Sequence, residues 1–189
     1  MITLPKLILA SGSPRRAEIL ASVGWEFTKV VPDIDESERP RESPETYVQR
    51  LAREKAEVVA AKNNKGVILA ADTTVVIDEQ IIGKPVDLDD ARRMLRLLSG
   101  KRHEVLTGVA VLTDGDMRIG LQRTGVKFAP LTEAEVNFLA EMGDPLDKAG
   151  AYAVQAQAAL FIEAIHGDYW NVVGLPLSLV YRLMTNLTS

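Results

Sequence analysis

The stretch VILAADTTVVI at residues 67–77 decides the fold class, because β-branched and apolar residues fill it except at the polar triplet 72–74. Such a run is typical of a buried strand. Residues 78–80 then form a turn into Ile81 and Ile82, which is the pattern of a β-hairpin. The centre of the chain is therefore predicted to contain antiparallel strand pairing.

Towards the start of the chain, predicted strands alternate with helices. Residues 6–10 predict a short buried strand, and Ser13-Pro14 supplies an N-cap and a first-turn proline for a helix to about Val23. Residues 26–31 alternate like a second strand, and the charged segment 32–42 is predicted to be a surface loop. A second cap-and-proline pair, Ser43-Pro44, begins a long amphipathic helix that lasts until Asn63 and Asn64.

Towards the end of the chain, helices and strands continue to mix. The predicted elements are a helix capped by Asp87 and ending at Leu98, strands at 104–112 and 117–128, a helix from the capping box Thr132/Glu135 to Met142, a strand at 160–165 and a helix at 175–187. Helix alternation combined with hairpins predicts an α/β protein with a mixed sheet. A chain of 189 residues suits one domain or two tightly joined lobes, so we expect a single domain over 1–189.

Composition excludes several classes of function. Hydrophobic residues make up 47% and charged residues 25%, as in an ordinary globular chain. The formal net charge is −4, which argues against nucleic acid as a partner. The chain has no cysteine and only two histidines, so disulfides, a thiol nucleophile and a histidine-built zinc site are not expected.

The sequence also predicts a cytoplasmic location and no membrane partner. Residues 1–6 lack the features of a secretory signal. The longest uncharged run, Ala149 to Ile162, is shorter than the ~20 apolar residues that a membrane span needs.

One acid stands out because of where it lies. Asp72 interrupts a strand that should be buried, and an unpaired buried carboxylate would be costly. Metal coordination, general-base work or a structural hydrogen bond could each supply its partner. Lys55 lies on the apolar face of its helix by periodicity, so it either snorkels to solvent or meets an anion. Arg50, one position off that apolar stripe, is predicted to be solvated.

The segment 10–16 (ASGSPRR) has the composition of an anion-binding site. Ser11 and Ser13 leave room for a ligand at a helix start, and Arg15 and Arg16 follow in the first turn. An ordinary capped helix with solvated arginines is the alternative. Lys84, between Gly83 and Pro85, and Glu36, in the charged loop, are by themselves more typical of surface residues.

These segments together resemble the Maf-like nucleoside triphosphate pyrophosphatases over nearly the full length. The resemblance rests on motifs in one order: 9–16, 47–56, 71–74, 83–85, 98–100 with His103, 147–152 and 167–176. It implies a two-lobed, inosine triphosphatase-like α/β fold with a mixed twisted sheet flanked by helices around a cleft. It also implies a homodimer that hydrolyses nucleoside triphosphates to monophosphate and pyrophosphate with Mg²⁺ or Mn²⁺.

The resemblance implies a role for each candidate residue. Asp72 would be the proton acceptor, and Glu36 would hold the metal with it. The phosphates would be bound by Ser11, Ser13, Arg15, Arg16, Lys55 and Lys84, and the specificity positions would be Arg15, Thr73 and Gln155. Thr73 and Gln155 imply dTTP and UTP as substrates. A nucleotide-binding regulator of cell division without turnover is the alternative, but such a protein would not need Asp72.

One segment departs from the family pattern. Family members commonly place a glycine next to the specificity glutamine, whereas residues 153–157 read AVQAQ in this chain. If the backbone needs a positive φ angle there, the shape of this loop must differ.

Overall fold

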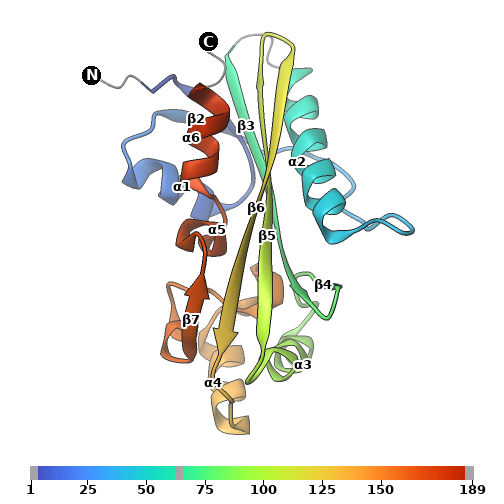
Figure 1. Ribbon diagram of the computed structural model, residues 1–189, viewed down its shortest axis with the longest axis vertical. Coiled ribbons are helices and arrows are strands. Elements are labelled where there is room, and N and C mark those ends of the chain that lie inside the picture. Colours follow the sequence, from blue (N-terminus) through green and yellow to red (C-terminus); the bar gives the residue numbers. More distant parts are fainter. Residues whose placement is uncertain (1–3, 63–65, 186–189) are drawn as a thin grey trace. The chain divides into compact units, whose positions relative to one another are not determined.

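The computed structural model describes residues 4–62 and 66–185. It contains a seven-stranded sheet with helices along it (Figure 1). The strands are β1 (Leu7–Ala10), β2 (Phe27–Val30), β3 (Val67–Ile77), β4 (Gln80–Ile82), β5 (Arg102–Thr113), β6 (Asp116–Phe128) and β7 (Ile162–His166). The helices are α1 (Pro14–Ser22), α2 (Pro44–Ala60), α3 (Leu88–Leu98), α4 (Glu133–Met142), α5 (Tyr169–Val173) and α6 (Leu177–Thr185).

The sheet is mixed, as the sequence predicts. Its order is β2-β1-β3-β5-β6-β7, with β4 paired to β3. Strand β1 pairs in parallel with β2 and β3, whereas β3–β4 and β6–β7 are antiparallel. Only two residues, Asp114 and Gly115, join β5 to β6, and a link this short permits antiparallel pairing alone.

The chain divides into two compact units. The first unit contains Met1–Asp72, Thr107–Gln122 and Gly174–Ser189, and the second contains Thr73–Leu106 and Arg123–Val173. The long strands β3, β5 and β6 contribute residues to both. No helix in the described part of the chain has the length and apolar character needed to cross a membrane.

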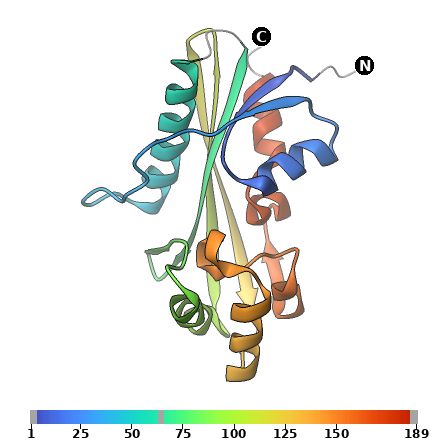
Figure 2. The same cartoon turned by 180° about the vertical axis from the view of Figure 1, so that it is seen from behind.

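In the first unit, α2 packs on the sheet through small side chains. Ala52, Ala56 and Val59 of α2 form a buried cluster with Ala10, Ile68, Ala70 and Ala110 from the strands. A Cβ atom at Gly108 would lie 2.3 Å from the Val48 carbonyl oxygen, so only glycine permits this approach of helix to strand. In both views α2 lies on one side of the strands, and α1 and α6 lie on the other (Figures 1 and 2).

In the second unit, a buried aromatic and polar group joins the strands to the segments that follow them. The His103 ring contacts Phe128 and Tyr152, and its Nε2 lies 2.7 Å from the Tyr152 hydroxyl. Asn171 Nδ2 donates to the Val105 carbonyl and to Thr124 Oγ1. Both interactions connect residues far apart in the sequence, so neither follows from the local pattern.

The region before the last helix differs from its prediction. The last helix is predicted over 175–187, yet α6 begins only at Leu177, and the short helix α5, which ends at Val173, is not predicted. Gly174 separates the two helices with a φ angle of 126°, a conformation that favours glycine. The predicted helix ends at Asn63, Asn64 and Leu187 lie outside the described residues.

Candidate functional site

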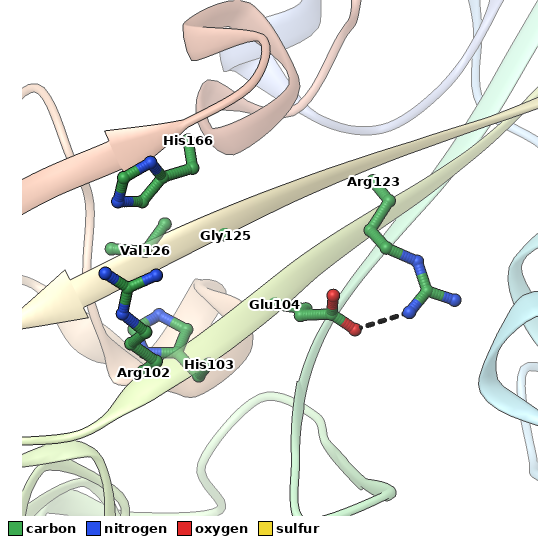
Figure 3. Close-up of a pocket in the computed structure, with 7 residues that line it drawn as sticks. All are labelled: Arg102, His103, Glu104, Arg123, Gly125, Val126 and His166. Carbon is green, nitrogen blue, oxygen red and sulfur yellow. Dashed lines mark hydrogen bonds and ion pairs between the residues drawn. The ribbon is translucent and has the colours of Figure 1, made fainter.

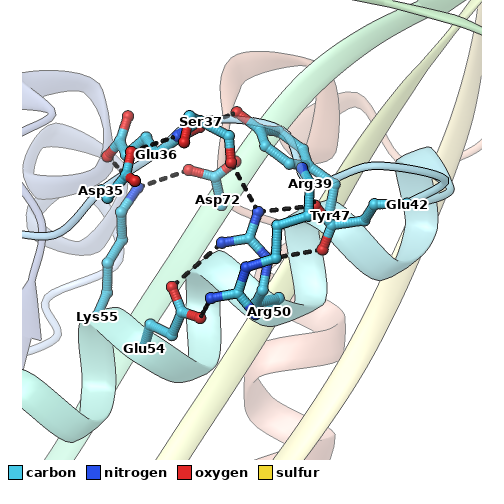
Figure 4. A network of polar contacts seen from close by, with 10 residues as sticks. All are labelled: Asp35, Glu36, Ser37, Arg39, Glu42, Tyr47, Arg50, Glu54, Lys55 and Asp72. Atoms are coloured by element: carbon cyan, nitrogen blue, oxygen red, sulfur yellow. Dashed lines mark hydrogen bonds and ion pairs between the residues drawn. The ribbon is translucent and has the colours of Figure 1, made fainter.

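The centre of the candidate site is a nearly buried lysine between two carboxylates (Figure 4). Lys55 Nζ lies 2.6 Å from Asp72 Oδ1 and 2.7 Å from Glu36 Oε1. Lys55 projects from α2, Asp72 from β3 and Glu36 from the charged loop before α2. The exposed fraction is 6% for Lys55 and 8% for Asp72, so both charges are largely removed from water. Of the two interpretations of Lys55, the structure supports the one in which its ammonium group pairs with an anion.

Burial and the neighbouring cations shift the pKa of Asp72 in opposite directions. Burial raises the pKa of the Asp72 carboxyl above its ordinary value, and Lys55 and Arg16 lower it in part. The second oxygen, Oδ2, accepts no hydrogen bond from any residue in the described part of the chain. Asp72 therefore combines increased basicity with an oxygen that can bind water or a cation.

The charged loop is held against α2 by side chains of that helix. The Tyr47 hydroxyl donates to the Glu36 carbonyl at 2.9 Å, and Arg50 Nη2 donates to the Ser37 carbonyl at 3.0 Å. Arg50 also contacts both carboxylate oxygens of Glu42, at 2.6 and 2.7 Å. Figure 4 shows these contacts in a row along the loop. They hold Glu36 where its side chain reaches Lys55.

The prediction that Arg50 is solvated is wrong. Its side chain is 10% exposed, because the loop folds back over the face of α2 from which Arg50 projects. The hydrogen bonds that Arg50 donates to Glu42 raise the pKa of the Arg50 guanidinium. Helical periodicity describes only the face that packs on the sheet, so it did not reveal this second covered face.

The segment at the start of α1 forms a compact polar turn. Ser13 occupies the N-cap position, but its side chain makes no capping bond, and the Ser13 amide instead donates to Ser11 Oγ at 3.1 Å. Arg16 donates through Nη1 to Ser11 Oγ and through Nε to the Gly174 carbonyl. Burial lowers the pKa of the Arg16 guanidinium. Arg16 therefore ties α1 to the segment before α6, and Arg15 beside it is partly exposed.

The remaining candidates belong to the second unit. Lys84 and Gln155 are exposed, and their side chains form no hydrogen bond or ion pair with any described residue. Thr73 follows Asp72 on β3 and is partly exposed. The backbone of the segment 147–160 forms short 3-10 turns, in agreement with its weak periodicity.

Positive φ angles near Gln155 occur at Gly150 and Ala151 and at no residue of 153–157. The alanines beside Gln155 therefore suit the backbone that this chain adopts. Ala151 is the exception that costs free energy, because a non-glycine residue at a φ angle of 64° is strained.

Asp72 and Glu36 fit a hard divalent cation. Both carboxylates converge on one ammonium group, which marks a position that attracts positive charge. No cluster of three or more histidine or acidic side chains that could hold a metal occurs among residues 4–62 and 66–185. Two carboxylates with ligands completed by substrate phosphates and water are the coordination that Mg²⁺ commonly accepts in proteins.

Comparison with known proteins agrees with this arrangement of motifs. The family model described as Maf-like protein matches residues 6–187. The chain belongs to the Maf-like family. This Maf-like chain is 45% identical over 182 residues to a dTTP/UTP pyrophosphatase of Symbiobacterium thermophilum, covering 96% of the chain and 94% of that protein.

Two further relatives carry the same name. The Maf-like chain is 49% identical to a dTTP/UTP pyrophosphatase of Hahella chejuensis, with 91% and 87% of the two chains covered. It is 48% identical to that of Halalkalibacterium halodurans, with 94% of each covered. A solved structure, the Staphylococcus aureus Ham1 protein, overlaps with a TM-score of 0.47 and 15% identity over 66% of this chain and 72% of that one.

Sequence reasoning missed two features of the Maf-like site. Tyr47 and Arg50, which hold the loop, lie within the 47–56 motif but were not assigned a role. The acidic loop just before this helix could have revealed their role, because its carboxylates can form ion pairs with an arginine on the helix.

Proposed function

We propose that this chain is a dTTP/UTP pyrophosphatase, which hydrolyses these nucleoside triphosphates to the monophosphate and pyrophosphate. The observation that carries the proposal is the Lys55 ammonium between Asp72 and Glu36, with distances of 2.6 and 2.7 Å. The names of relatives at 43–49% identity over most of their length support the same activity.

In this proposal Asp72 is the general base. Attack of water at the α-phosphorus needs a carboxylate that orients the water and takes its proton. The pKa of Asp72 is raised by burial, which brings the carboxyl nearer to the operating pH of a general base. Its Oδ2 atom is the oxygen that would receive the proton, since Lys55 already donates to Oδ1.

Cationic side chains would compensate the charge of the substrate. Lys55 holds the two acids in position before substrate binds, and Ser11, Ser13, Arg15, Arg16 and Lys84 are proposed to contact phosphate oxygens. Glu36 and Asp72 would hold Mg²⁺ or Mn²⁺. When bound, such an ion supplies Lewis-acid neutralisation of charge on the triphosphate.

The preference for dTTP and UTP is proposed to depend on Gln155. Uracil and thymine present a carbonyl beside an N–H group, which one orientation of the glutamine amide matches, whereas cytosine reverses that pattern. No described residue holds the Gln155 amide in one orientation. The amide is therefore proposed to become oriented only when the nucleotide binds.

The test is a panel of nucleoside triphosphates incubated with purified protein and Mg²⁺ or Mn²⁺. We expect monophosphate and pyrophosphate as products, with kcat/KM for dTTP and UTP about tenfold or more above that for CTP and for purine nucleotides. Equal or faster turnover of CTP would refute the base preference but not the pyrophosphatase activity. Absence of both products for every nucleotide would instead favour the non-catalytic regulator of cell division.

A homodimer, a cytoplasmic location and a single Maf-like domain over 1–189 are part of this proposal. Sedimentation of the purified chain tests the first of them. A monomer at the concentration of the assay, with full turnover, would show that the activity does not need a second copy.

A further inference from the structure

A pocket of about 350 Å³ lies in the second unit, lined by residues of β5, β6 and β7 (Figure 3). Its lining consists of Arg102, His103, Glu104, Arg123, Gly125, Val126 and His166. None of these residues belongs to the candidate site around Asp72. Both histidines of the chain line this pocket.

The charges of the pocket leave one guanidinium group without an anion. Arg123 Nη1 lies 2.7 Å from Glu104 Oε2, so these two charges compensate each other. The Arg102 side chain forms no hydrogen bond or ion pair with a residue that the structure describes. In Figure 3 Arg102 and His166 lie at the left of the view, Glu104 near its middle and Arg123 at its right, so Glu104 points towards Arg123 and away from Arg102. The end with Arg102 is therefore the positive one.

Gly125 opens the middle of this lining. It pairs with His166 across β6 and β7. A Cβ atom at Gly125 would meet only His166 atoms, the nearest at 3.7 Å, which is ordinary van der Waals contact. Packing against neighbours therefore does not require a glycine here, and its missing side chain leaves space beside Arg102.

We propose that this pocket binds a small oxyanion, a phosphate or carboxylate group held by the Arg102 guanidinium. A guanidinium fork matches the oxygens of such groups with two parallel hydrogen bonds. The exposed His166 borders the same space, and His103 also belongs to the lining. This site is separate from the proposed catalytic function and does not depend on it.

The two histidines provide a local readout. Imidazole resonances of the full chain are recorded by NMR during titration with inorganic phosphate, with acetate as the carboxylate probe and chloride at equal ionic strength as the reference. Because no histidine belongs to the candidate catalytic site, phosphate bound there does not contribute directly. His166→Gln assigns the signals.

We expect saturable shifts of at least one histidine with phosphate or acetate, and their relative affinity identifies which group the site prefers. Arg102→Gln should weaken binding about tenfold or more, and Gly125→Val should abolish it by filling the pocket. Arg96→Gln, a surface arginine paired with Glu133, should bind as the unchanged chain does. Absence of saturable shifts, or shifts of equal affinity in Arg102→Gln and Gly125→Val, would overturn the proposal.

Discussion

At the scale of a single residue, burial and neighbouring charges have opposite effects on the carboxylate of Asp72. Its carboxylate is nearly buried, which disfavours the charge, and Lys55 and Arg16 restore part of the stability of that charge. A carboxyl group in this balance is suited to accept a proton during a reaction and release it afterwards. A substitution that keeps the size of the side chain but removes its ability to accept a proton therefore tests the role of Asp72.

Replacement Asp72→Asn should reduce hydrolysis by ~10²–10⁴-fold, because the amide cannot accept a proton from water. Nucleotide affinity should stay within about tenfold, since the base acts mainly in the transition state. Pyrophosphate release and calorimetric nucleotide binding measure the two quantities. Asp78→Asn is the matched control, an exposed acid in the β3–β4 turn whose φ of 51° asparagine tolerates. Near-normal turnover of the Asp72 variant would remove it from the mechanism.

Lys55→Ala should lower kcat/KM by about ten- to a hundredfold, because a charge-assisted hydrogen bond contributes ~1.5–3 kcal/mol. The variant also leaves Asp72 and Glu36 without the ammonium group between them. Lys62→Ala serves as the control, since Lys62 is an exposed lysine just after α2. Steady-state kinetics with dTTP compares the two variants. Equal effects would mean that the position of Lys55 on the buried face has no special role.

At the scale of elements, the charged loop and α2 act together. The loop has no regular structure of its own, and Tyr47, Arg50 and Glu42 connect it to the helix. Burial raises the pKa of Tyr47 to about 12, so its hydroxyl remains a donor at neutral pH. The helix therefore places Glu36 through the loop backbone as well as through Lys55.

Tyr47→Phe should weaken apparent metal affinity by up to about tenfold, because one hydrogen bond to the Glu36 carbonyl, worth ~0.5–1.5 kcal/mol, is lost. At saturating Mg²⁺, kcat should be nearly normal, since Tyr47 positions Glu36 and does not touch the substrate in this proposal. Activity measured against Mg²⁺ concentration separates the two effects. Tyr181→Phe, on the exposed face of α6, should change neither. A fall in kcat with an unchanged Mg²⁺ dependence would contradict the positioning role.

At the scale of the whole molecule, His103 couples stability to pH. Burial lowers the pKa of His103 to about 4, whereas an imidazole in the unfolded chain has a pKa of ~6.5. Between these values the unfolded state binds more protons. The stability is therefore fully present above pH ~6.5 and is lost as the pH falls towards 4.

The free energy of unfolding should fall by about 2 kcal/mol between pH 7 and pH 5 through this residue alone. Urea unfolding at both pH values measures it as the difference between the unchanged chain and His103→Gln. An equal pH dependence in the unchanged chain and the His103 variant would show that this histidine is not held neutral.

Several parts of the site could be predicted and others could not. Asp72 is visible as an acid in an apolar strand, and Lys55 as a cation on an apolar helix face. Arg50 was misread because the loop covers a face that the helical pattern assigns to solvent. The pairing of His103 with Tyr152 had no local signal.

The sequence by itself determined most of the elements and their starts, α5 excepted, because these depend on residues close together in the chain. Ser43, Asp87 and Thr132 each cap a helix through an amide three residues later, and the 67–82 hairpin needs only its own turn. Only the tertiary structure decided the partners: Asp72 meets Lys55 at a separation of 17 residues, His103 meets Tyr152 at 49, and Asn171 reaches Val105 at 66. Such pairs depend on which surfaces pack together, and that is a property of the whole chain.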